Sequence, residues 1–150
     1  VRSRRQRQMC IRDRHPHHVA LEARQPNLEG AGGISLARLV RESLRMRPDR
    51  LVVGECRGEE VRELLTALNT GHDGGAGTLH ASGLSDVPAR LEALGALASM
   101  DATALARQAV SAFTIVLHLD RAPGGRRRIA QAGVLALTGD RLGIEEVRPW

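Results

Sequence analysis

The stretch Leu51-Val52-Val53-Gly54-Glu55 is an uninterrupted apolar run that ends in a glycine and a single carboxylate. A short aliphatic run bounded by turn residues is typical of a strand buried on both faces, as in a parallel sheet covered by helices. Ligands of such sheets bind at the carboxyl ends of the strands. Glu55 is therefore a candidate general base, which in a nucleotide hydrolase orients the attacking water and accepts its proton. The alternative is a solvated residue at a helix start.

The residues that follow predict one strand–helix–strand unit. Apolar residues at helical spacing come after Glu59 and Glu60 and end before a glycine, which predicts a helix. These apolar residues are Val61, Leu64, Leu65 and Leu68. A short strand is then expected over residues 78–81, with His80 near its carboxyl end. Because consecutive strands are usually neighbours in a sheet, Glu55 and His80 are predicted to emerge side by side.

The rest of the chain predicts two helices followed by three antiparallel strands. Ser85 or Asp86 is expected to cap the first helix and Asp101 the second, which ends at about Ser111. Apolar and polar residues alternate over residues 113–120, which is typical of a half-exposed strand. Glycine-containing turns at 122–125 and 139–140 separate it from further strands, expected over residues 126–138 and 141–147.

Several of these segments resemble one protein family. Residues 44–60 look like the Walker B region of bacterial type II/IV secretion ATPases, and residues 70–81 with Arg90-Leu91-Glu92 look like their histidine box. Residues 21–30 and a helix expected over residues 35–47 resemble the tight-adherence (Flp) pilus branch. The resemblance covers residues 16–138. It implies an α/β fold, the C-terminal part of a RecA-like P-loop core, in which a parallel sheet with helices precedes antiparallel strands.

The resemblance also implies a function. Members of this family are hexameric ATPases that power pilus assembly or protein secretion at the bacterial inner membrane. For this chain it implies ATP and Mg²⁺ as cofactors, a homo-hexamer, a pilus or secretion platform protein as partner, and no nucleic acid. The expected location is cytoplasmic and peripheral to the inner membrane. No secretory signal and no run of apolar residues long enough to span a membrane is visible.

Roles for individual residues follow from the same resemblance. Glu55 is the expected catalytic carboxylate, and His80 is expected to contact the γ-phosphate or to report its loss to the adjoining subunit. The residues expected near the nucleotide are Gly54, Arg24, Arg57 and His72. Each has a simpler alternative: His80 as a strand-end cap, His72 as a cation favoured by a helix dipole, and either arginine as an ordinary surface charge.

The phosphate-binding loop of this family has no counterpart in the sequence. The chain contains no lysine and no GxxxxGK[ST] motif, so the backbone cradle for the phosphates and the hydroxyl that holds magnesium are missing. Gly74-Gly75-Ala76-Gly77 is no substitute, because it enters a strand where a phosphate loop must open a helix; it is interpreted as a tight turn. We therefore expect the chain to be inactive alone. A scaffold paralogue that has lost hydrolysis is an alternative.

The basic charge of the chain is confined to its first residues. The formal net charge is +5, and residues 1–14 hold six arginines and one acid, Asp13, which gives the same +5. This segment lacks apolar periodicity and resembles translated sequencing-adapter strings, so it is interpreted as non-family sequence, either artefactual or a disordered basic arm, ahead of one unit over residues 15–150. A non-catalytic arginine-rich binding module would need a basic folded face, and stacking aromatics are limited to Phe113 and Trp150.

Cysteine and histidine provide no sequence signal for a metal site. Cys10 and Cys56 have neither metal-ligand spacing nor the pattern of a disulfide framework. His15, His17 and His18 are close together, but no second pair of ligands accompanies them. The triplet Arg126-Arg127-Arg128 is interpreted as a solvated strand start, with a contact to anionic lipid or a partner as the alternative.

Overall fold

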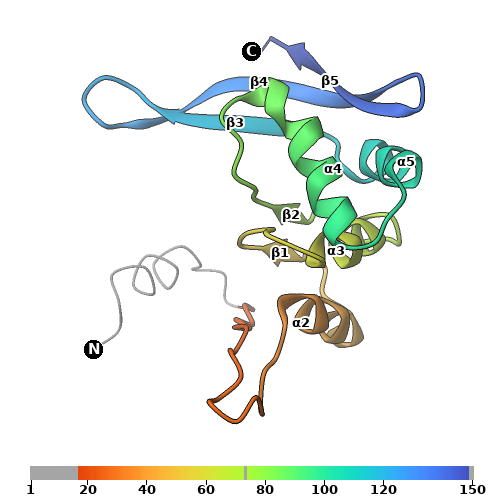
Figure 1. Cartoon of the computed structure of the whole chain (residues 1–150). Coiled ribbons are helices and arrows are strands. Elements are labelled where there is room, and N and C mark those ends of the chain that lie inside the picture. The colour runs from red at the N-terminus through yellow and green to blue at the C-terminus, as the bar shows by residue number, and fades with distance from the viewer. Residues whose placement is uncertain (1–16, 73, 149–150) are drawn as a thin grey trace.

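The computed structural model describes residues 17–72 and 74–148, so the basic segment of residues 1–14 lies outside the described residues (Figure 1). Helices and strands alternate in its first half, and three strands complete the second half. In chain order the elements are α2 (Leu36–Ser43), the 3-10 helix η1 (Leu44–Met46), β1 (Val52–Val53), α3 (Glu60–Leu68), β2 (Ala76–Gly77), the 3-10 helix η2 (Leu84–Asp86), α4 (Val87–Leu97), α5 (Ala102–Ala112), β3 (Val116–Arg121), β4 (Arg127–Thr138) and β5 (Arg141–Val147).

The predicted strand–helix–strand unit is present, but its first strand is not buried on both faces as expected, since Val53 is 2% exposed and Val52 is 70% exposed. β1 and β2 pair in parallel and α3 connects them (Figure 1). The second strand begins at Ala76, two residues before the predicted segment 78–81, and ends at Gly77. Pairing nevertheless continues past the strand, because Thr78 N–H donates to the Val53 carbonyl (3.3 Å) and Cys56 N–H donates to the Thr78 carbonyl (2.7 Å). The two segments that follow β1 and β2 therefore run side by side up to Glu55.

The glycines before His80 do more than form a turn. Gly74 has φ +77°, which fits the predicted turn. Gly75 and Gly77, however, lie where a side chain would not fit: a Cβ on Gly75 would be 2.7 Å from Leu68 Cδ2, and one on Gly77 would be 2.8 Å from Leu64 Cδ2. Both leucines belong to α3. The glycines at these two positions thus allow α3 to pack closely on β2 and the residue before it.

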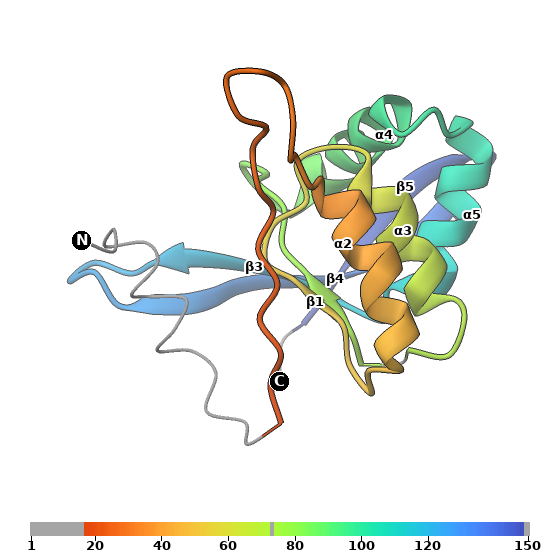
Figure 2. The ribbon, with the colours of Figure 1, turned by 90° about the horizontal axis from the view of Figure 1, so that it is seen from below.

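The C-terminal half forms a second sheet with helices on one face. β3, β4 and β5 pair in that order and antiparallel, as predicted. Both α4 and α5 contact this sheet, and α3 packs against α2, α4 and α5. In Figure 1 α4 and α5 lie between the antiparallel sheet and α3, whereas α2 lies on the side of α3 away from that sheet. Figure 2 shows the helices together on the side opposite the β3–β4 hairpin.

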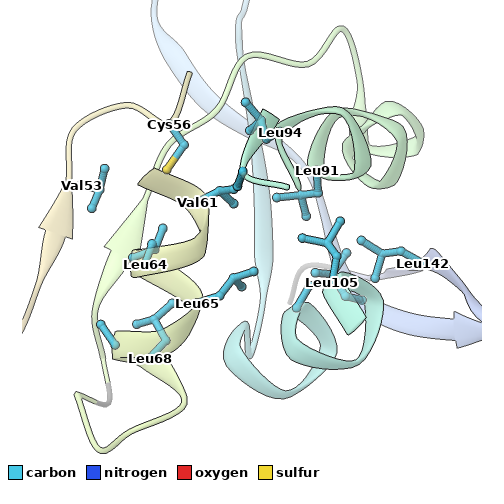
Figure 3. Packing of buried hydrophobic residues seen from close by; sticks show 14 of the residues in the cluster. Val53, Cys56, Val61, Leu64, Leu65, Leu68, Leu91, Leu94, Leu105 and Leu142 are labelled. Atoms are coloured by element: carbon cyan, nitrogen blue, oxygen red, sulfur yellow. The ribbon is translucent and has the colours of Figure 1, made fainter. Parts of the chain in front are cut away.

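One continuous apolar core joins these layers. Figure 3 shows α3 contributing Leu64 and Leu65 to it, while Leu105 of α5 and Leu142 of β5 enter from the other side. Leu64 is 1% exposed and Leu65 is 0% exposed. Burial of such leucines is worth about 1.5–3 kcal/mol each, so the packing of α3 carries much of the stability of the unit that holds Glu55.

Helix ends follow local chemistry more closely than apolar spacing. Asp101 caps α5 as predicted, with its Oδ1 accepting from the N–H groups of Thr103 and Ala104 (3.0 and 3.1 Å). The helix expected over residues 35–47 instead ends as a 3-10 turn at Met46, because Arg47 adopts φ 51° ahead of a proline. Asp86 precedes α4, but its side chain makes no cap hydrogen bond.

β3 alternates in exposure, as expected of a half-exposed strand, but its leucines lie on the open side. Leu117 and Leu119 are 43% and 60% exposed. Val116, by contrast, packs against the core. Ile129, which pairs with Leu119 across a register shift, is 46% exposed. The sheet therefore has an apolar face that no described residue covers.

Residues 17–35 form an extended N-terminal arm. Its one paired position joins Arg24 to Ile34 in an antiparallel bridge. Asn27 closes the loop between them, with its Oδ1 accepting from the N–H groups of Glu29 and Ala31. Leu28 at the tip of the loop is fully exposed. The arm thus has local order but few contacts with the core.

Candidate functional site at the ends of the parallel strands

Glu55 and His80 come together as the sequence predicts. His80 Nε2 lies 2.8 Å from Glu55 Oε1, and Arg57 Nη2 lies 2.6 Å from Glu55 Oε2. All three residues follow the carboxyl ends of β1 and β2. One carboxylate thus bridges two cationic or potentially cationic groups at the edge of a parallel sheet, the usual place of ligand sites in such sheets.

Backbone and hydroxyl hydrogen bonds fix the two strand ends relative to each other. Thr78 Oγ1 donates to the Gly54 carbonyl, which ties the residue before Glu55 to the chain that leads to His80. The backbone bond from Cys56 to Thr78 lies one step further along. Gly54 leaves open space where a Cβ would be. The pairing of Glu55 with His80 is therefore set by strand register.

A second carboxyl group holds the loop that follows Glu55. Glu60 is 6% exposed, although it begins α3. Its Oε1 accepts hydrogen bonds from the backbone N–H groups of Arg57 and Gly58, the latter at 3.0 Å. Since these two N–H groups precede the helix and have no partner within it, Glu60 supplies the acceptor they need.

Charges around the site favour the ionised form of Glu55. Its pKa is lowered, chiefly by the hydrogen bond from Arg57 and against the opposing effect of burial, with smaller contributions from His80. Glu55 Oε1 is itself buried, with His80 Nε2 2.8 Å away, and this contact contributes to the lowered pKa. A ligand or water reaches this oxygen only when the His80 ring moves. Burial and the neighbouring carboxylates of Glu60 and Glu55 raise the pKa of Cys56 to about 12.

The site lies on an open surface. The side chains of His80 and Arg57 are 85% and 69% exposed, whereas that of Glu55 is 26% exposed. One cleft, of about 540 Å³, lies between α4 and the β4–β5 strands. A smaller cleft lies between α2 and α3. Neither cleft is lined by Glu55 or His80. The carboxylate and the imidazole therefore lie at the surface and outside both clefts.

The structure does not bring Arg24 and His72 to this group. The Arg24 guanidinium donates to the Gly32 carbonyl (2.7 Å) within the N-terminal arm. His72 Nδ1 lies 3.3 Å from the Ala67 carbonyl, at the end of α3 remote from Glu55. Their expected roles at the nucleotide stay predictions.

Glu60 and Thr78 are site residues that the sequence reading missed. The sequence places Glu60 just before the apolar residues of a helix, and a Glu two or three positions after loop residues with free N–H groups is a capping signal, since its carboxylate can accept from those backbone donors. For Thr78 no sequence signal is evident, because its hydroxyl bond depends on the pairing of two distant segments.

Metal binding and membrane spanning find no support in the described residues. Within residues 17–72 and 74–148 no three His, Cys, Asp or Glu side chains are grouped to hold a metal ion, and His15 lies outside them. None of the helices described is both long and apolar enough to span a bilayer.

Comparisons with known proteins point to one family. Residues 11–136 match the model of the type II/IV secretion system protein family. A putative conjugal transfer protein of Mycobacterium tuberculosis is 50% identical over 151 residues, covering 97% of this chain and 42% of the relative. The alignment therefore extends into residues 1–14, the segment interpreted above as non-family sequence.

More distant relatives carry related names. The conjugal transfer protein TrbB of Rhizobium radiobacter is 36% identical over 102 residues, 67% of this chain and 31% of that protein. The protein VirB11 of Agrobacterium tumefaciens is 39% identical over 66 residues, 44% of this chain and 19% of that protein. The chain spans about two fifths of the length of the mycobacterial relative and less of the others. With most of its length matched by the family model, the chain belongs to the type II/IV secretion system protein family.

Proposed function

We propose that the chain supplies the water-activating and γ-phosphate-sensing part of a RecA-like ATPase motor, from the C-terminal part of its motor domain. The observation that carries this proposal is the 2.8 Å approach of His80 to Glu55 at the ends of two parallel strands. A carboxylate that is ionised, half-buried and open on one side is suited to general-base chemistry. Membership of the secretion family supports a motor over other nucleotide hydrolases.

Glu55 is the base in this proposal. Its carboxylate accepts a hydrogen bond from the attacking water, once the contact with His80 or Arg57 opens, and then takes the proton. The Arg57 guanidinium lowers the pKa of Glu55, which keeps the carboxyl ionised and also weakens it as a base. A guanidinium that moves from Glu55 to a phosphate oxygen therefore strengthens the base when the substrate is in place.

His80 is the sensor of the terminal phosphate. Its ring is 85% exposed, so one edge contacts Glu55 while the other is open to a ligand. An imidazole in this position can donate to a phosphate oxygen and stabilise charge that develops on it. Loss of that phosphate is transmitted directly to Glu55, because the two side chains touch.

ATP with Mg²⁺ would supply the phosphoryl group whose transfer to water drives such motors. The residues at the site fit the terminal phosphate and the attacking water, through Glu55, Arg57 and His80. They do not provide a cradle for the other phosphates: residues 74–77 lead into β2, whereas a phosphate loop opens a helix. We assign that task to a GxxxxGK[ST] segment of the longer protein.

Unpaired sheet edges support the placement of this chain in a larger RecA-like core. In the described residues β2 pairs with β1 alone and β3 with β4 alone. Each of these strands therefore has one edge without a partner, and exposed edges are normally paired or covered. The open apolar face that carries Leu117, Leu119 and Ile129 lies on the same sheet as the free edge of β3. In this proposal, a strand that leads into the phosphate loop pairs with a free strand edge, and the helix after the loop covers the apolar face.

At the level of the whole protein, we propose a homo-hexamer of the tight-adherence pilus branch, peripheral to the inner membrane and coupled to a platform protein. The names of the relatives favour transport of macromolecules across an envelope, in their case conjugal transfer. The open surface at Glu55 supports completion of the site by other segments or subunits.

The test compares ATP hydrolysis by this chain and by a longer protein in which an upstream phosphate-loop segment is joined to it. The longer protein should hydrolyse ATP in the presence of Mg²⁺, whereas the 150-residue chain should show neither hydrolysis nor calorimetrically detectable binding at micromolar concentration. Saturable ATP binding by the short chain, with Kd near 10 μM or about −7 kcal/mol, would contradict the assignment of the phosphate cradle. An inactive longer protein that binds ATP normally would favour the scaffold paralogue.

A further inference from the structure

Glu60 is buried at the start of a helix, where acidic residues are usually solvated. It is 6% exposed, and its Oε1 accepts two hydrogen bonds from consecutive backbone N–H groups, those of Arg57 and Gly58. A buried carboxyl group is costly unless it is satisfied in this way. These contacts lie within the four-residue connection between Glu55 and the first turn of α3.

We propose that Glu60 is a positioning residue of the site, which holds the loop of residues 55–58 so that the Arg57 guanidinium meets the Glu55 carboxylate. This inference rests on the proposed function of Glu55 as the base. Glu60 touches neither a substrate nor the Glu55 side chain in this proposal. It acts through the backbone of Arg57, whose side chain reaches Oε2 of Glu55 at 2.6 Å.

The loop has few other restraints, which makes this contact important. Before α3 its backbone is held by the bond from Cys56 to Thr78 on one side and by the turn bonds of Val61 and Arg62 to Gly58 and Glu59 on the other. The Arg57 side chain is 69% exposed, so burial restrains it little. The two N–H groups bound by Glu60 are thus the fixed points nearest to the guanidinium.

A charge effect and a positioning effect of Glu60 predict opposite results. If Glu60 acted only as a nearby negative charge, its neutralisation would ease ionisation of Glu55 and lower the pKa of that carboxyl further. If Glu60 positions Arg57, its truncation loosens the Arg57–Glu55 pair, the largest cause of the lowered pKa, and the pKa of Glu55 rises toward its ordinary value.

The experiment measures the pKa of Glu55 by NMR titration of side-chain carboxyl carbons in the 150-residue chain. Glu60→Ala and Glu60→Asp, which withdraw the acceptor, should raise the pKa of Glu55. Glu60→Gln keeps an acceptor oxygen in place and should leave it near the native value. Glu63→Ala is the matched control, because Glu63 lies one turn further along α3 and pairs with Arg41 (3.7 Å) instead.

An unchanged or lowered pKa of Glu55 in Glu60→Ala would overturn the proposal. If that variant does not fold, the result for Glu60→Asp decides in the same way.

In the longer protein, Glu60→Ala should lower kcat by roughly 10- to 100-fold with KM little changed, the scale expected for a misplaced group. Glu60→Gln should restore most of the lost kcat. The titration does not depend on hydrolysis, so it tests the positioning role even if Glu55 proves not to be the base.

Discussion

His80 Nε2 lies 2.8 Å from Oε1 of Glu55, although the two residues follow different strands, β2 and β1. Their approach depends on the parallel register that pairs Val53 with Gly77, and on the hydroxyl bond from Thr78 to the Gly54 carbonyl. A slip of one residue would turn either side chain to the other face of the sheet. The close packing that sets this register is therefore as important to the site as the two side chains.

Gly75 should be the glycine that tolerates substitution least. A Cβ there would lie 2.8 Å from the Leu51 carbonyl oxygen, which is backbone and already accepts a hydrogen bond from Ala76. At Gly77 the nearest obstacle is the flexible end of the Leu64 side chain. We expect Gly75→Ala to lower the free energy of unfolding by about 1–3 kcal/mol, as overpacking does, and Gly77→Ala by less.

Urea denaturation of the two variants checks this order. Gly139→Ala is a useful control, because a Cβ there meets no neighbour and only its φ of 62° is unfavourable. Equal stability of Gly75→Ala and the native chain would show that the helix can move away from β2 without loss, and the register would then have another origin.

Cys56 should make stability fall at high pH. Its pKa is about 12 in the folded chain against an ordinary value of 9.0, because burial opposes the thiolate. Below pH 9 both states hold the proton and stability is unaffected. Between pH 9 and 12 only the unfolded chain loses it, so unfolding becomes easier as pH rises, by at most about 4 kcal/mol over the window at 1.36 kcal/mol per pH unit.

The composition makes this measurement clean. The chain has no tyrosine and no lysine, so few other side chains titrate between pH 9 and 12. A Cys10→Ala background isolates Cys56, and the further change Cys56→Ala should remove the slope while lowering stability at neutral pH through a small cavity. A slope that persists without Cys56 would assign it to another group.

The sequence predicted the parts of the structure that depend on local pattern. The short strand before Glu55, the helix with Leu64 and Leu65, and the cap by Asp101 all follow from spacing and capping chemistry within one segment. The neighbourhood of Glu55 and His80 followed from the usual pairing of consecutive strands.

What could not be predicted depends on contacts between segments. Glycine has low strand propensity, so the start of β2 at Ala76 depends on its pairing with β1 and on the close approach of α3, which local pattern does not show. The burial of Glu60 could not be predicted, because it depends on how the preceding loop folds back. The exposure of Leu117 on β3 likewise depends on which face the helices cover.

Asp101 should contribute a measurable share of the stability of α5. Its carboxylate accepts two backbone N–H bonds at the helix start. Asp101→Ala should therefore lower the free energy of unfolding by about 1 kcal/mol, as the loss of an N-cap usually does, and Asp101→Asn should restore most of it. Asp140→Ala, in an exposed turn 3.7 Å from Arg107, should change stability far less. Similar losses in the two alanine variants would contradict the capping role.

Deletion of residues 1–14 should leave the melting temperature essentially unchanged, because this segment lacks apolar periodicity and holds the net charge of the chain. Differential scanning calorimetry of the shortened and complete chains decides the matter. A decrease of several degrees, which corresponds to more than about 1 kcal/mol for a chain of this size, would show that the segment packs on the folded unit and belongs to it.

The most direct measurement is ATP turnover in the longer protein with Glu55→Gln and His80→Ala compared under the same conditions. Glu55→Gln keeps the shape of the side chain but removes the base, so turnover should fall by roughly 10²–10⁴-fold with ATP affinity nearly unaltered. His80→Ala removes a charge-stabilising contact and leaves the base in place, so its effect should be smaller. Near-normal turnover in Glu55→Gln together with its loss in His80→Ala would contradict the assignment of Glu55 as the catalytic carboxylate.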